Sequence, residues 1–427
     1  MRLVSIFKII ALIGLLAVKP QAFAQNKVLT LEDCRRMALE NNNTIKSAQF
    51  DLDASKAASK SVKSGALPTL DASLTGAHFG DPLTQYLPSV LANVGIDVKQ
   101  TIYSGGKVRY NKQAAEKNVE VYDSQKIMTQ TEILLEMEQD YWQVVQAKEK
   151  IALALKYKER LQSLKIDLKN QVDAGLTYKN DLLRAEVNLN QAELDIIKAN
   201  DALVLSMLNL AQVIGQPGNI DFSVTDQVNG DFEPIMDWPA ESLSEKRPEI
   251  DILKKSIEAE QIQSKVIRAD IKPQIALSLS GIGSFGKDVN FSNGSNNLAT
   301  YYSLLTLNVP IFDWGKNANK VKEQNFKIES KKADLEQNKE LITIEIQNAY
   351  LQLNQSHKKI NLTKASLAQA EENLRLASDR YKAGTIIGKD VLEAQVIWQE
   401  AYTDIIEAKI EYKINLAGYK KAIGELK

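Results

Sequence analysis

The chain has 427 residues, with 53 Lys or Arg against 54 Asp or Glu, so its net charge at pH 7 is −1. This balance gives no indication of nucleic-acid binding, which needs an excess of positive charge. Cys34 is the only cysteine, so an internal disulfide is excluded. Its place in a helical turn indicates a buried, small apolar side chain rather than a reactive thiol.

The first 24 residues are predicted to be a secretory signal peptide. A basic start, an apolar run over 9–18 and a small-residue cleavage site at 22–24 follow one another, so we expect the mature chain to start at Gln25. The alternative is a membrane anchor, but the apolar run is too short to span a bilayer. No later segment has the ~20 apolar residues of a membrane helix, so the exported chain is expected to be soluble or a β-barrel.

A repeat at a fixed offset organises the rest of the chain. At an offset of 209 residues Tyr141 matches Tyr350, and an Ala-Gly pair at 174–175 matches another at 383–384. Farther upstream the offset falls to 205, so four residues are inserted in the second copy. Matching flanks around an insertion are typical of two copies of one unit with a variable loop. We therefore predict two structural repeats, over residues 25–215 and 240–427.

Two pairs of segments alternate apolar and polar residues with a period of two, which predicts β-strands. The predicted strands span about 68–79, 91–103, 274–285 and 301–312, and the Asn-, Ser- and Gly-rich stretch 286–300 is expected to be a loop. Such strands suit a membrane β-barrel, apolar to lipid and polar to the lumen, although two soluble sheets packed together would show the same alternation. Pro310 is expected at the end of its strand, where a missing donor costs least.

Two very long helices are predicted over 106–173 and 315–382, because no Gly or Pro interrupts either stretch after its first residue. Their apolar residues recur in alternating steps of four and three, which indicates helices that wind around neighbours as a left-handed coiled coil. In the first copy Asp140, Lys158 and Lys165 interrupt this apolar seam.

Shorter helices are expected to complete each copy. Each long helix turns at an Ala-Gly pair into an antiparallel partner, and a further helix precedes the first strand of each copy; these four helices are predicted over 179–214, 389–423, 43–66 and 248–271. Between the copies, 216–239 contains several Pro and Gly among apolar residues. We predict an irregular equatorial segment that lies as a belt across the helices.

The sequence shows no catalytic constellation, so we expect neither an enzyme nor a bound cofactor or metal. His78 and His357 each lack a nearby His or Cys that could complete a metal site. The G-x-G-x-x-G match at 281–286 ends a predicted strand and enters a polar loop rather than a helix, so it is not read as a dinucleotide-binding turn.

The chain resembles the TolC-like outer-membrane efflux channel family over nearly all of its mature length. The resemblance rests on the duplicated order of helix, two strands, long helix and partner helix, and on short motifs at matching places. These motifs are the strand entry at Leu67 and Pro68, the strand exits at Gly105-Gly106 and Trp314-Gly315, the tips at 172–176 and 381–385, and the start at 29–33.

The resemblance implies a mainly α chain with two membrane β-hairpins, in a homotrimer. Its twelve-stranded barrel, four strands per chain, would cross the outer membrane and continue as a coiled-coil tunnel in the periplasm. Four strands cannot close a barrel and lipid does not tolerate an open edge, so the residues themselves require more than one chain. The trimer would be the passive exit duct of a tripartite efflux pump or type I secretion system, with a periplasmic adaptor and an inner-membrane transporter as partners.

The resemblance also implies which residues form an aperture and the docking tips. Asp390 and Glu393 share one helix face and match an acidic pair that rings the family's periplasmic aperture, with ordinary helix-start acids as the alternative. Tyr381 and Asp181 match members of the network that closes the family's tips, but Ile386 stands where that network has an Arg, so closure must differ here. The tip residues expected to bind the adaptor are Ala174, Gly175, Leu176, Ala383, Gly384 and Thr385.

The competing function is a periplasmic coiled-coil adaptor or scaffold that never enters a membrane. Such a protein would need a lipoyl-like or small β-barrel domain beside one hairpin. Two long repeats with amphipathic strands argue against it, so the residues favour the channel.

Overall fold

The computed structural model describes residues 27–225 and 232–426, so the predicted signal peptide 1–24 and the predicted mature start at Gln25 lie outside the described residues. The chain folds as two compact units, and each long helix contributes to both. The hairpin unit comprises the described parts of 27–42, 133–235 and 352–417, and the sheet unit comprises 43–132, 236–351 and 418–426.

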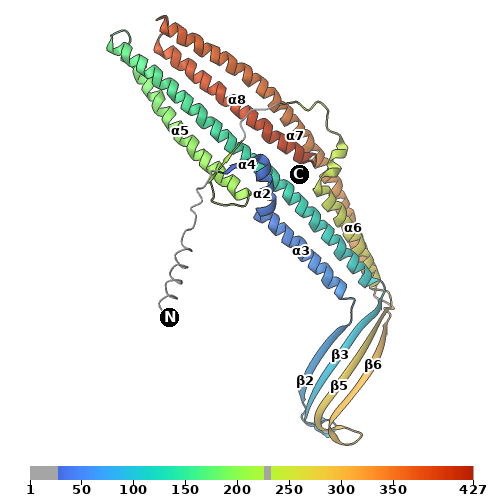
Figure 1. Ribbon diagram of the computed structural model, residues 1–427. Helices are drawn as coiled ribbons and strands as arrows, with labels where there is room; N and C mark the ends of the chain where they lie inside the picture. Colours follow the sequence, from blue (N-terminus) through green and yellow to red (C-terminus); the bar gives the residue numbers. More distant parts are fainter. Residues whose placement is uncertain (1–26, 226–231, 427) are drawn as a thin grey trace, which may run out of the picture. The chain divides into compact units, whose positions relative to one another are not determined.

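The sheet unit joins four helical segments to four strands (Figure 1). Its elements are α3 (Asn43–Ser64), β2 (Thr69–His78), η1 (Leu83–Gln85), β3 (Val90–Ser104), the first part of α4 (Lys107–Asp173), η2 (Glu241–Lys246), α6 (Pro248–Ala269), β5 (Gln274–Asn290), β6 (Ser295–Asn308), the first part of α7 (Lys316–Lys382) and the last residues of α8 (Gly388–Ala422).

The strands form one antiparallel sheet in the order β2-β3-β5-β6, so β2 and β6 are its edges. The register places Asp71, Asp97, Ser280 and Tyr302 in one row on the polar face. The opposite face is apolar and exposed; examples of its exposed fractions are 78% for Leu74, 54% for Ile96 and 65% for Leu305. The predicted alternation is thus present, and none of residues 27–225 and 232–426 covers the apolar face of these strands.

The second strand pair differs from its predicted bounds. β5 continues to Asn290 and β6 begins at Ser295, so only residues 291–294 turn, where the sequence predicted a loop over 286–300. The ladder extends because Asn290 pairs with Ser295 across the turn, which outweighs the loop-like composition. β6 ends at Asn308 rather than 312, because Pro310 has no N–H to donate to a ladder. The G-x-G-x-x-G match lies entirely inside β5.

The hairpin unit consists of two antiparallel helix pairs with a small two-stranded sheet (Figure 1). Its elements are β1 (Lys27–Leu29), α2 (Leu31–Asn41), the rest of α4, α5 (Lys179–Val213), β4 (Phe222–Val224), the rest of α7 and most of α8 (Gly388–Ala422). A buried cluster joins α4, α5, α7 and α8 and includes Leu161, Leu168, Ala185 and Leu374. No helix among residues 27–225 and 232–426 has both the length and the hydropathy that a membrane crossing requires.

The two lysines that interrupt the apolar seam of α4 are paired with acids on the neighbouring helix. Lys158 Nζ lies 3.0 Å from Glu193 Oε1, and Lys165 Nζ lies 3.2 Å from Glu186 Oε1. Both glutamates are on α5. The third interruption, Asp140, has no such partner in the described residues, and burial raises its pKa to about 6. The two lysine interruptions therefore reflect contacts between helices that the apolar pattern alone does not show.

The internal repeat is visible in the hydrogen bonds that close each copy. The Asn42 side chain donates to the backbone oxygen of Val213 at 2.9 Å, and the equivalent Arg247 side chain donates to that of Ala422 at 3.2 Å. These positions are related by the offsets 205 and 209 seen in the sequence. The mainly helical, duplicated fold with two strand hairpins is confirmed.

The segment between the copies is held against helices of the hairpin unit. Lys148 donates to the Val224 oxygen at 2.8 Å, Asn354 bonds the backbone N and O of Ile235 at 3.1 Å each, and Tyr412 donates to the Glu233 oxygen at 2.7 Å. The segment is less irregular than predicted, because β4 pairs in parallel with β1, far away in sequence.

Candidate functional site

Both hairpin tips use the same glycine turn. Gly175 and Gly384 have φ of 72° and 71°, a left-handed conformation that glycine adopts without strain. After each glycine the next residue donates back five positions, from Leu176 to Gln171 at 2.8 Å and from Thr385 to Arg380 at 3.0 Å. This Schellman arrangement satisfies carbonyls that the helix end leaves free.

The tips present apolar side chains to solvent. Leu176 is 78% exposed, Tyr178 85% and Ile387 54%. Nothing lies within 4 Å of a Cβ added at Gly175 or Gly384, so backbone conformation alone selects glycine there. Ala174, Ala383 and Thr385 are exposed as well. The predicted docking residues therefore form accessible ends of the two hairpins.

Tyr381 directly precedes the turn of the second tip in sequence. Its side chain lies inside the hairpin unit, near residues of the first hairpin. Its side chain is buried, and its hydroxyl has no hydrogen-bond partner of ordinary geometry. Burial raises the pKa of the phenol, and the charges of Asp167 and Asp181 raise it further, while Gln171 acts in the opposite direction. The structure thus brings Tyr381 and Asp181 near each other, without a direct hydrogen bond between them.

Ile386, at the position where the resemblance implies an Arg in the closing network, makes an apolar contact instead. Ile386 is half-buried and packs against the cluster of the hairpin unit. Two residues on, Gly388 starts α8 so close to α4 that an added Cβ would lie 2.6 Å from Leu168 Cδ2. Because glycine has no side chain, the second hairpin packs directly on Leu168 at Gly388. Gly388 was not among the predicted site residues, because its importance depends on a residue of another helix.

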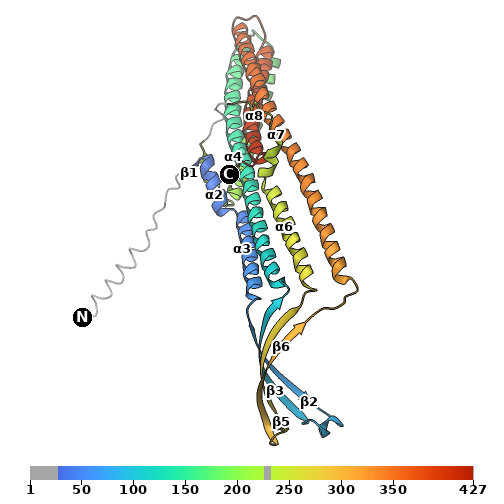
Figure 2. The ribbon, with the colours of Figure 1, turned by 90° about the vertical axis from the view of Figure 1, so that its right-hand side faces the viewer.

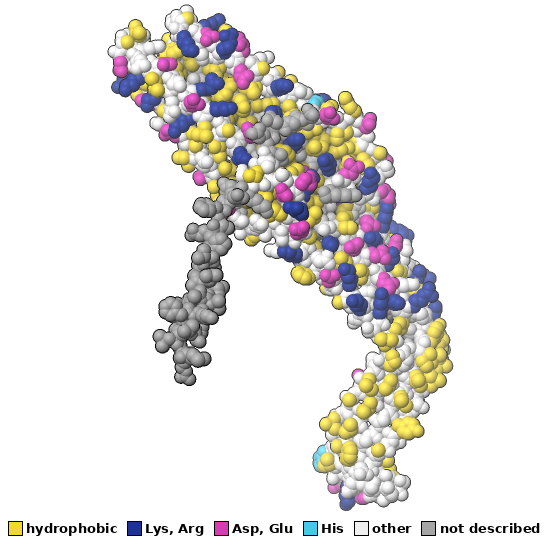
Figure 3. Space-filling model, viewed as in Figure 1, with side chains coloured by type: hydrophobic (Ala, Val, Ile, Leu, Met, Phe, Trp, Pro, Cys, Tyr) yellow, Lys and Arg dark blue, Asp and Glu magenta, His cyan; other side chains and the backbone are white. Residues whose placement is uncertain are grey.

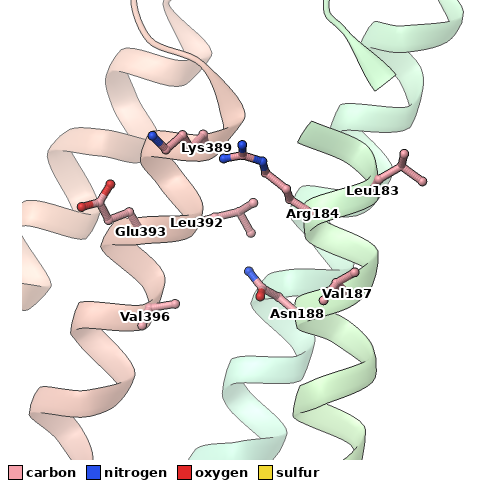
Figure 4. A pocket seen from close by; sticks show the side chains of 8 residues that line it. All are labelled: Leu183, Arg184, Val187, Asn188, Lys389, Leu392, Glu393 and Val396. Carbon is pink, nitrogen blue, oxygen red and sulfur yellow. The ribbon is translucent and has the colours of Figure 1, made fainter. Parts of the chain in front are cut away.

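Asp390 and Glu393 are both exposed at the start of α8, but they have different surroundings. Asp390 accepts a 3.4 Å hydrogen bond from the backbone N of Ile387, as an acid in a first helical turn does. Glu393 borders a groove of about 510 Å³ between α5 and α8. Figure 4 shows its carboxylate pointing away from α5, whereas Arg184 and Leu392 reach into the groove.

Positive charge accompanies these acids. Lys389 and Arg184 line the same groove as Glu393, and neither makes an ion pair within the residues that the structure describes. The local charge is therefore more balanced than the acidic pair alone suggested. Any effect of the two acids on passing ions has to be judged against these two cations.

A second groove, of about 410 Å³, lies between α4 and the α7–α8 hairpin. Its lining includes Tyr381 and Gln395, whose hydroxyl and Oε1 are buried and have no hydrogen-bond partner of ordinary geometry among the described residues. Arg160 borders it and stacks over the Trp398 ring at 4.5 Å. No group of His, Cys, Asp and Glu in the described ranges could hold a metal ion.

These features define a class of protein: a duplicated helical-hairpin protein that carries a four-stranded sheet with an exposed apolar face. The family model for outer membrane efflux proteins matches residues 35–216 and 240–425. The chain therefore belongs to the outer membrane efflux protein family.

Individual relatives agree with this assignment. The chain is 22% identical to outer membrane protein TolC of Vibrio cholerae over 405 residues, covering 93% of this chain and 91% of that protein. It is 22% identical to alkaline protease secretion protein AprF of Pseudomonas aeruginosa over 288 residues, covering 66% and 59%. The CusC structure, described in connection with transmembrane channel formation, superposes with a TM-score of 0.81 at 16% identity and 92% coverage of both chains.

The chain is thus an outer-membrane channel that extends into the periplasm, and it is a transport duct rather than an enzyme. Channels of this family form homotrimers and work with periplasmic adaptors and inner-membrane transporters, in efflux or in type I secretion. The prediction of an exit duct is confirmed. The competing reading, a periplasmic adaptor or scaffold, is wrong.

Proposed function

We propose that three copies of this chain close one twelve-stranded barrel in the outer membrane, which their long helices continue as a periplasmic tunnel. Substrates pass through it to the outside from a periplasmic adaptor and an inner-membrane transporter. The duct itself is passive, because it is a transport channel of the outer membrane efflux family and not an enzyme.

The sheet is the main observation that supports this proposal. Its edges β2 and β6 each have one strand neighbour, and no described residue of the chain covers its apolar face. In lipid every backbone donor and acceptor must be satisfied, so open edges have to pair with other copies. Three sheets joined edge to edge satisfy both edges and turn the polar row of Asp71, Asp97 and Ser280 toward a lumen.

The tips are the proposed adaptor-binding surface. This proposal is supported by three exposed apolar side chains beside the two glycine turns, those of Leu176, Tyr178 and Ile387. Apolar side chains at the end of a coiled coil suit the packing of further helices against them.

The proposed gate lies just behind the tips. Tyr381 and Asp181 line the contact between the two hairpins, and Ile386 with Gly388 supplies an apolar closure in place of an ionic one. Asp390 and Glu393 are proposed to face the aperture, where Lys389 and Arg184 reduce their negative field.

A charge on either face of the sheet tests this assignment. Val94→Arg places a cation on the apolar face and is expected to cost ~2 to 4 kcal/mol near the bilayer midplane, which should impair assembly. Asn93→Arg, on the polar face one residue away, is the matched control and should be tolerated. Both variants are followed by outer-membrane fractionation and by heat-modifiable trimer migration. Equal tolerance of the two charges would contradict the lipid-facing assignment.

A further inference from the structure

Four helix ends meet the sheet at the same end. α3 leads into β2 and α6 into β5, while β3 leads into α4 and β6 into α7. Because the sheet is antiparallel, the first residues of β2 and β5 lie at the same end as the last residues of β3 and β6. Figure 2 shows these connections on one side of the strands.

These helix ends are strongly basic. The ten residues of each helix end nearest the strands, 57–66, 107–116, 263–272 and 313–322, contain eleven Lys or Arg and three acids, although the whole chain has a net charge of −1. We call the eleven cations the basic collar: Lys60, Lys63, Lys107, Arg109, Lys112, Lys265, Arg268, Lys272, Lys316, Lys320 and Lys322. Figure 3 shows Lys and Arg gathered where the helices reach the sheet.

The three acids do not neutralise the collar. Asp270 Oδ1 lies 2.7 Å from Lys107 Nζ, and Glu116 Oε1 lies 2.9 Å from Lys63 Nζ. Asp313 instead accepts from the backbone N of Gly315 at 3.0 Å and of Asn317 at 2.8 Å, at the start of α7. The other nine cations of the collar are exposed and form no ion pair within the described part of the chain.

An exposed aromatic and apolar belt adjoins the collar at the strand ends. Ile311 is 94% exposed, Phe312 72%, Trp314 89% and Tyr103 47%. The rings of Phe312 and Trp314 meet edge to face at 4.8 Å between centroids. Trp and Tyr at this exposure are typical of the level of lipid headgroups, where one end of the ring is apolar and the other wet.

We propose that the basic collar binds the anionic headgroups of phospholipids at the periplasmic surface of the outer membrane. The belt places the boundary of the hydrocarbon at the strand ends, and long Lys and Arg side chains one to three helical turns away reach the phosphate level. In a cluster beside a membrane segment, each cation near the surface raises the affinity for anionic lipid about five-fold. The collar thus fixes the depth of the channel and surrounds it with anionic lipid. This inference rests on the trimeric channel proposed above.

The test measures which lipid surrounds the assembled trimer. The full channel is reconstituted in bilayers of phosphatidylcholine with phosphatidylglycerol, and the relative association of spin-labelled forms of the two lipids is measured. At low salt we expect wild type to prefer phosphatidylglycerol at least five-fold, and the preference to fall in 1 M salt, where the screening length is about 3 Å. The triple variant Lys316→Gln, Lys320→Gln, Lys322→Gln should reduce it at least two-fold.

The matched control removes three exposed cations of the hairpin unit that form no ion pair among the described residues, in the variant Lys169→Gln, Lys198→Gln, Lys364→Gln. It changes net charge equally and should keep the wild-type preference. An unchanged preference in the collar variant, or an equal loss in the control, would overturn the proposal. Selective binding of purified peptidoglycan without lipid preference would assign the collar to the cell wall instead. If the trimeric channel does not form, the result is distinguishable from a failure of the lipid-binding proposal, because no heat-modifiable trimer would then be recovered from the bilayer.

Discussion

The two hairpin tips share a backbone and differ in their side chains. Both turn at a glycine in the left-handed conformation, with the same pattern of hydrogen bonds. At the start of the following helix, however, the first copy has Lys179 where the second has Gly388, which comes within contact of Leu168. The shared backbone therefore sets how each hairpin turns, and the side chains set how closely each can pack on its neighbour.

The same comparison separates the polar groups of the two tips. The buried Tyr381 stands where the first copy has Val172, and Glu393 stands where it has Arg184. The second hairpin thus combines a tight apolar seat with a buried hydroxyl and an extra acid. This difference supports assigning the proposed gate mainly to the second hairpin, with the first as the surface against which it closes.

The largest expected effect tests whether the shared turn is used for docking. Gly384→Val puts a branched residue at φ 71°, at a cost of about 1–2 kcal/mol, with nothing within 4 Å of its Cβ. We expect export to be abolished and trimer yield to stay near wild type, as measured by an export assay and by gel migration. Gly175→Val imposes the same strain on the other tip. Loss of the trimer in either variant would show that the glycine serves folding instead.

A second prediction concerns the seam of α4, where Asp140 matches Ala349 in the second copy. Burial, with help from Glu136, raises the pKa of Asp140 to about 6, so the folded chain binds a proton more tightly than the unfolded one. The contribution of Asp140 to stability is therefore greatest below pH 4 and is lost as pH rises to about 6. Asp140→Asn should raise the stability of the trimer at pH 7 by about 1 to 2 kcal/mol, since solvent screens this partly exposed carboxylate, and leave it unchanged at pH 4. Equal shifts at both pH values would remove titration of Asp140 as the cause.

The contact of Gly388 with Leu168 gives a third prediction. Gly388→Leu would force a shift at Leu168, because an added Cβ would lie 2.6 Å from its Cδ2, and the larger Leu side chain should displace the second hairpin. We expect closed-state conductance in planar bilayers to rise about ten-fold, which corresponds to about 1.4 kcal/mol in the closing equilibrium. Lys179→Leu, at the equivalent exposed position of the first copy, should leave it unchanged. If both variants conduct alike, the two hairpins are equivalent in closure.

The smallest expected effect concerns the acids. Asp390→Asn with Glu393→Gln should weaken block by a trivalent cation from the periplasmic side several-fold. Stability should change by less than about 0.5 kcal/mol, because Asn also accepts a hydrogen bond at a helix start. Arg184→Gln should strengthen the block, since it removes a cation from the same groove. An unaltered block in the double variant would show that the acids serve only the helix.

Features that depend on local sequence were predicted well. The span of α4 and α7 followed from the absence of Gly and Pro, and the glycine turns followed from the repeated Ala-Gly pair. Contacts between distant segments were missed. β4 forms only because residues 27–29 pair with it, and β5 reaches Asn290 because the opposite strand continues the ladder.

The candidate site shows the same division. Its positions were predicted from the tips and from the resemblance, but the surroundings of those positions were not predicted. That Ile386 packs into an apolar cluster, that Gly388 meets Leu168 and that cations lie beside Glu393 depend on how helices from both copies pack. A sequence pattern describes one helix at a time, so it cannot show what faces a residue from another helix.

The closure of three sheets into one barrel is the central claim, and cross-linking of the sheet edges tests it most directly. In a Cys34→Ser background, Ser73→Cys on β2 is combined in turn with a cysteine at Thr300, Tyr302 or Leu304 on β6, and the assembled protein is oxidised. A disulfide forms only where two Cα atoms come within about 4.4–6.8 Å, and β2 and β6 are opposite edges within one chain. We predict that at least one pair yields a covalent species of three chains and none larger. Cross-links confined to single chains, or species of more than three chains, would contradict the account.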